Sequence, residues 1–137
     1  MWPQRSTILG DDGAPKIHRH YLLGTGKTFG VFLHHFVGSD ARTVFHDHPW
    51  TWGVALVLRG GYTEESRDRD GTTFARRWLG AGRINVLLPG VFHRVELRDG
   101  RPAWTLFIHA RKVRRWGFLD SVTGAFAFWS PSDRRYP

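Results

Sequence analysis

Short apolar and β-branched runs alternate with glycine, proline and aspartate along most of the chain. No window long enough for a helix places apolar residues at the i, i+3, i+4 and i+7 spacing, and no capping box precedes such a window. Short runs separated by turn residues are typical of an all-β sandwich or barrel. Strands are predicted over residues 17–23, 29–37, 54–58, 62–66, 72–79, 84–87, 93–97, 104–110 and 125–129.

The length and the spacing of turns indicate a single domain. A chain of 137 residues can bury one core and is too short for two. Asp68-Arg69-Asp70-Gly71 predicts a hairpin tip, and Pro89-Gly90 predicts a tight turn. Residues 1–15 are polar and irregular, so we expect a flexible N-terminal arm there and a β-barrel domain over residues 16–137.

Composition and charge limit the partners. The chain has no cysteine, which excludes disulfides and thiolate-bound metals, so a metal must be held by histidine, carboxylate or water. The formal net charge is +8, but the arginines are scattered, so a small anionic substrate is expected and nucleic acid is not. The N-terminus lacks the pattern of a secretory signal and no apolar stretch could span a bilayer, so we expect a cytoplasmic protein.

The strongest chemical signal is the tripeptide His46-Asp47-His48. In an extended strand, His46 and His48 point to one face while Asp47 points to the other. Pro49 favours an extended conformation at His48. Together with His93, which follows Pro89-Gly90, the two histidines suit a divalent transition metal: Fe(II), Mn, Ni, Zn or Cu.

Two motifs around these histidines resemble those of the cupin superfamily. The first cupin motif is a glycine, a loop, His-x-His and a closing glycine, which Gly38, His46-Asp47-His48 and Gly60 or Gly61 match. The second is a glycine, an apolar strand, proline and Gly-x-x-His, which Gly82 to His93 match. The resemblance implies a double-stranded β-helix, or jelly-roll barrel, with a metal site at His46, His48 and His93.

A narrower resemblance is to small phage and bacterial cupins with an HDHPW motif. It is carried by His46-Asp47-His48-Pro49-Trp50, Leu58 to Glu65, Trp104-Thr105-Leu106 and Arg115 to Phe118. This group implies the fold and the metal site but no substrate.

The chain departs from the cupin pattern at one ligand. The usual glutamate would fall near Trp52 or Gly53, and neither side chain can bind a metal. Three neutral histidines leave the charge of an ion uncompensated, which favours an anionic, chelating substrate. Cupins with three-histidine sites include thiol dioxygenases and some ring- and diketone-cleaving dioxygenases, so the resemblance implies an Fe(II)-dependent oxygenase.

Other residues are candidates for catalysis or substrate binding. His109 and one of the adjacent His34 and His35 could face the interior as a fourth ligand or an acid–base group. Arg42, in the loop before His46, could clamp a substrate carboxylate. Trp50, Trp52, Trp78 and Trp104 either line the pocket or fill the core.

Two other functions remain open for this sequence. One is a metal-independent sugar-nucleotide epimerase, a jelly-roll class that uses a His–carboxylate base, a Tyr acid and cations around a diphosphate. The other is a non-catalytic module that binds a small ligand. The resemblance to cupins also implies a possible homodimer formed through edge strands.

Overall fold

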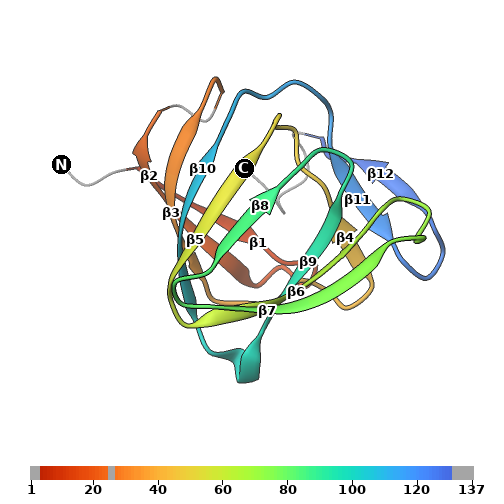
Figure 1. Ribbon diagram of the computed structural model, residues 1–137, viewed down its shortest axis with the longest axis horizontal. Helices are drawn as coiled ribbons and strands as arrows, with labels where there is room; N and C mark the ends of the chain where they lie inside the picture. Colours follow the sequence, from red (N-terminus) through yellow and green to blue (C-terminus); the bar gives the residue numbers. More distant parts are fainter. Residues whose placement is uncertain (1–3, 25–26, 131–137) are drawn as a thin grey trace.

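The computed structural model describes residues 4–24 and 27–130 as a barrel of antiparallel strands (Figure 1). One short 3-10 turn, η1 (Arg98–Gly100), precedes β10. The strands are β1 (Arg5–Leu9), β2 (Pro15–Leu23), β3 (Gly30–Phe36), β4 (Val44–His46), β5 (Gly53–Arg59), β6 (Gly61–Arg67), β7 (Phe74–Gly80), β8 (Ile84–Leu87), β9 (Phe92–Leu97), β10 (Ala103–His109), β11 (Gly117–Asp120) and β12 (Phe126–Phe128).

The strands form two sheets that face each other across the core (Figure 1). Sheet A has the order β1-β2-β3-β10-β5-β8, and sheet B has the order β12-β11-β4-β9-β6-β7. Six of the ten pairs of neighbouring strands are not consecutive in sequence, as β3, β10 and β5 illustrate. This jelly-roll order confirms the predicted all-β class and single domain.

Each predicted strand has a counterpart in the structure, but three observed strands were not predicted: β1, β4 and β11. The expected flexible arm over residues 1–15 is corrected for residues 5–9, since β1 pairs with β2 and Ile8 is fully buried. Residues 1–3 of that arm and 131–137 of the predicted domain lie outside the described residues. β4 and β11 have only three and four residues, which makes their alternation hard to recognise.

Alternation along the strands decides which side chains enter the barrel. In β3 every second residue is buried, so Phe32, His34 and Phe36 face the interior. Their neighbours on β10, including Thr105 and Phe107, are buried in the same way. The inner face of sheet A therefore carries both aromatic rings and polar groups. The polar residues His34 and Thr105 lie opposite each other on β3 and β10.

A glycine turn places the third histidine of the predicted site. Pro89 and Gly90 connect β8 to β9, and Gly90 has φ +79°, a conformation that glycine adopts without steric cost. His93 is the second residue of β9. Among the described residues, no helix has the length and apolar character needed to cross a membrane.

Candidate metal centre

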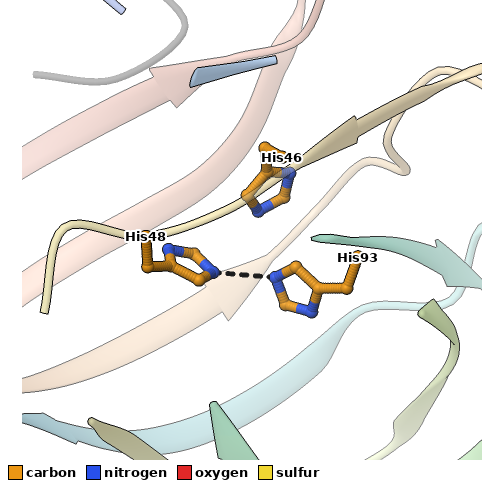
Figure 2. Close-up of side chains that lie close together, drawn as sticks. All are labelled: His46, His48 and His93. Carbon is orange, nitrogen blue, oxygen red and sulfur yellow. Dashed lines mark hydrogen bonds between the residues drawn. The ribbon is translucent and has the colours of Figure 1, made fainter. Parts of the chain in front are cut away.

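Three histidines converge inside the barrel, two on strands of sheet B and one just after β4 (Figure 2). His46 ends β4 and lies directly opposite His93 of β9 in the antiparallel pair. His48 follows two residues later and points to the same side, as strand parity predicts. The ring centroids of the three residues, called here the histidine triad, lie 4.6 to 5.0 Å apart.

The triad has the spacing needed for one ion. Nε2 of His48 lies 2.8 Å from Nε2 of His93, and two nitrogens at right angles around an ion would be about 3.0 Å apart for bonds near 2.1 Å. The ligand atoms of all three residues lie within 4.8 Å of one another, so small side-chain rotations bring them to a common centre. The donor set therefore fits a divalent transition metal.

Glu64 fixes the orientation of His93. Its Oε2 lies 2.9 Å from Nδ1 of His93, an arrangement that directs Nε2 of this ring toward the triad. Asn85 also donates to Glu64, and Arg77 donates to it at 3.1 Å. Burial alone would raise the pKa of Glu64, but the bonds from His93 and Asn85 and the charge of Arg77 lower it to about 2. An ionised carboxylate therefore lies behind one of the three proposed ligands.

Asp47 anchors the segment between the other two histidines. It points away from the triad and accepts a hydrogen bond from the backbone N–H of Gly117 at 2.7 Å. The Asp47 N–H donates back to the Gly117 carbonyl at 3.2 Å, and Arg114 donates to the His48 carbonyl at 2.8 Å. Burial raises the pKa of Asp47. These contacts, which join the segment to β11, hold His46 and His48 on a fixed backbone.

His48 is held in the form that binds metals. Its ring stacks on Trp50 at 4.7 Å with an interplanar angle of 10°. Burial, followed by the neighbouring His93 and His46, lowers the pKa of His48 well below 6.5. Its imidazole is therefore neutral at neutral pH, with a lone pair available for an ion.

The triad opens into an internal cavity of about 60 Å³. This space exceeds what one water requires. The wall that faces the triad comes from sheet A and carries Arg19, His34 and Thr105. Lys16 also lines the cavity, where it is paired with Asp40.

Three residues predicted as candidates lie away from this cavity. His109 faces inward but lies behind Trp50, on which it stacks at 4.5 Å, and its Nδ1 contacts the Ala110 carbonyl. His35 lies on the outer face of sheet A, stacked on Trp104 at 3.9 Å, so His34 is the inward member of that pair. Arg42 is exposed and lines a separate surface pocket.

Sequence reasoning missed Glu64, Arg19 and Thr105. Glu64 shares the inward parity of Tyr62 on its strand, a signal that the sequence contained. Arg19 and Thr105 could not be related without the strand order, because they meet through β3. Of the four tryptophans considered, Trp50 lines the cavity.

Comparisons with known proteins relate the chain to solved structures by fold alone. No family model matches the chain, and a search of curated proteins finds no match either. Among solved structures, Fe(II) HppE in complex with substrate superposes with a TM-score of 0.62 at 12% identity, over 78% of this chain and 56% of that chain. A tryptophan-to-tyrosine variant of oxalate decarboxylase from Bacillus subtilis gives 0.59 at 12% identity, over 80% of this chain and 28% of that chain.

The chain has the cupin fold. The TT1209 protein of Thermus thermophilus adds a match of similar length, with a TM-score of 0.55 at 17% identity over 72% of this chain and 86% of that chain. Against the HppE structure the chain spans little more than half the neighbour's length. At these identities the likeness concerns the fold, while the triad is a property of this chain's own residues.

Proposed function

We propose that this protein is a mononuclear metal-binding cupin whose triad holds a divalent transition metal, with Fe(II) as the favoured ion. The observation that carries the proposal is the convergence of His46, His48 and His93 on one point inside the barrel. Likeness in fold to an Fe(II) form of HppE supports the choice of iron. The narrower kinship with small cupins that carry the HDHPW motif belongs to the same proposal.

The reaction we propose is oxidation of a small anionic molecule by oxygen. Bound iron would supply redox chemistry with oxygen and Lewis acidity toward the substrate. His46, His48 and His93 would hold the ion from one side and would leave the side toward sheet A accessible to substrate. Aromatic residues such as Phe36 and Phe107 line the cavity and limit the entry of water.

Around the ion, the residues of this chain would act by positioning. Glu64 holds the ring of His93, and Asp47 holds the backbone that carries His46 and His48. The positive charge of the protein would attract an anion toward the barrel.

Elemental analysis of untagged protein followed by oxygen uptake tests the proposal. We expect about one metal ion per chain, and oxygen consumption by the iron-loaded protein with a panel of small acids, thiols and diketones. The His46→Ala variant provides the control and should show neither. Absence of metal binding would refute the metal centre, whereas metal and anion binding without oxygen uptake would make the protein a binding module.

The alternative of a sugar-nucleotide epimerase has one observation in its favour. His93 and Glu64 form a His–carboxylate pair, and Tyr62 lines the same cavity. However, burial raises the pKa of Tyr62 to about 12, which makes it a poor acid at neutral pH. Nε2 of His93 also faces His48 rather than open space. We therefore favour the metal-dependent function.

A further inference from the structure

Two polar atoms in the cavity wall are buried without a hydrogen-bond partner. They are Oγ1 of Thr105 and Nε1 of Trp50, in residues that are 1% and 7% exposed. Both residues line the cavity that contains the triad. Buried polar atoms in folded proteins are nearly always hydrogen-bonded. Two unpartnered polar atoms in the wall of one cavity therefore indicate a ligand that forms hydrogen bonds with them.

Thr105 belongs to a line of polar side chains across the inner face of sheet A. In the strand register Arg19 of β2 lies opposite His34 of β3, and His34 lies opposite Thr105 of β10. We call Arg19, His34 and Thr105 the polar row. Its members face the cavity from sheet A, whereas the triad faces it from strands β4 and β9 of sheet B and from the segment after β4.

Arg19 brings a positive charge to this row. Its Nε donates to Nε2 of His34 at 3.1 Å, and its guanidinium lies over the Phe32 ring at 4.6 Å. Burial, and then the charge of Arg19, lower the pKa of His34 well below 6.5, so this acceptor is neutral. The hydrogen bond to His34 orients the guanidinium along the row. The other cavity cation, Lys16, is paired with the carboxylate of Asp40.

Trp50 places a donor beside the triad. Its ring is held between His48 and His109, at 4.7 and 4.5 Å, so its orientation is fixed. An indole N–H only donates, and therefore requires an oxygen or another acceptor. With Arg19 and the hydroxyl of Thr105, the cavity wall offers donors from three side chains to an anion.

We propose that the space between the histidine triad and the polar row is a binding subsite for a short carboxylate, recognised by Arg19, Thr105 and Trp50. The inference deepens the proposed function and rests on it for the metal that faces this subsite. A carboxylate suits these donors because it is small, planar and able to accept several hydrogen bonds at once. The cavity of about 60 Å³ limits the ligand to a few heavy atoms.

Calorimetric titration of the protein with matched probes tests the subsite. Acetate, pyruvate and malonate are compared with acetamide, pyruvamide and malonamide, and inorganic phosphate serves as a tetrahedral anion of similar size. Each probe is titrated into metal-free protein and into protein loaded with Zn(II), which does not react with oxygen. We expect at least one carboxylate to bind ten-fold or more tightly than its amide and than phosphate.

The isosteric Thr105→Val variant removes one hydroxyl and should weaken carboxylate binding about ten-fold. Trp50→Phe should weaken it similarly, and Arg19→Gln should abolish it. Thr63→Val provides the matched control, because Thr63 points outward from β6 and does not line the cavity. Thermal unfolding and zinc content of each variant separate loss of the subsite from loss of the fold or of the metal.

The outcomes separate this subsite from the metal centre. Loss of carboxylate binding in Thr105→Val with unchanged zinc content supports the subsite. Equal carboxylate affinity in Thr105→Val and in the parent, or tighter binding of phosphate or the amides, overturns it while the metal centre stands. If neither zinc nor iron binds, the proposed function fails, and titration of the metal-free protein still decides the subsite.

Discussion

Nδ1 of His93 lies 2.9 Å from Oε2 of Glu64, which places a buried carboxylate directly behind a proposed metal ligand. The two residues come from neighbouring strands of sheet B, β9 and β6. A carboxylate in this position fixes the tautomer and raises the basicity of a ligating imidazole. Glu64 supplies the negative charge that the triad itself lacks. It would be separated from a bound ion by the ring of His93.

Replacement of Glu64 by glutamine should weaken metal binding. The amide keeps the size of the side chain but removes the charge, and loss of such a partner lowers metal affinity by about 10- to 100-fold. Competition with a metal-binding dye measures the change. Glu96→Gln provides the control, because Glu96 lies on the same sheet, is partly exposed and does not contact the triad. Equal affinities in the two variants would show that Glu64 does not support the site.

Removal of a triad histidine should abolish tight metal binding and leave the barrel folded. The fold has its own apolar core, including Ile8, Phe36 and Val57, so it does not depend on an ion as a zinc finger does. We expect His46→Ala to unfold cooperatively near the parent temperature in the metal-free state. His93→Ala should be less stable, because it leaves Glu64 buried without this partner.

Metal content and thermal unfolding, measured on the same samples, check both variants. His35→Ala is the control, since this histidine lies on the outer face of sheet A. A non-cooperative transition in metal-free His46→Ala would assign the triad a structural role.

Part of the triad could be predicted from sequence because its geometry is local. Parity places His46 and His48 on one face, and the turn at Pro89-Gly90 introduces the strand of His93. The strand order that makes His46 and His93 direct neighbours is a tertiary property. It was reached through resemblance to a known family rather than through periodicity.

The surroundings of the triad depend on contacts between distant segments. The polar row requires β2, β3 and β10 to lie side by side, and no pattern within a single strand indicates this order. Strand parity favoured Arg42, whereas Arg19 reaches the cavity through the sheet. Similarly, β1 was missed because pairing with β2, rather than its own five residues, makes it a strand.

Asp47 should contribute to stability through one backbone hydrogen bond. Asp47→Ala leaves the Gly117 N–H buried without its acceptor, which costs about 1–3 kcal/mol. Asp47→Asn retains an oxygen that can accept this bond and should lose less. Chemical denaturation measures both free energies of unfolding. Equal losses would show that the charge near Arg114, rather than the bond to Gly117, supplies the stability.

His34 should make the stability of the metal-free protein depend on pH. Burial, and then the positive charge of Arg19, lower its pKa well below 6.5, with smaller effects from His109 and His20. The unfolded chain therefore binds a proton that the folded protein does not, and its free energy of unfolding falls as the pH drops through about 6.5.

His34→Gln tests this dependence, because glutamine offers an acceptor to Arg19 but does not titrate. Denaturation between pH 7.5 and 5.5, in the presence of a chelator, should show a shallower decline in the variant. The difference is at most one proton, or about 1.4 kcal/mol per pH unit. The triad histidines contribute equally to both proteins and cancel in the comparison.

His35→Gln is the control. His35 lies on the outer face, where burial lowers its pKa less, so this variant should alter the slope less. Parallel profiles for His34→Gln and the parent would mean that His34 is protonated alike in the folded and unfolded states.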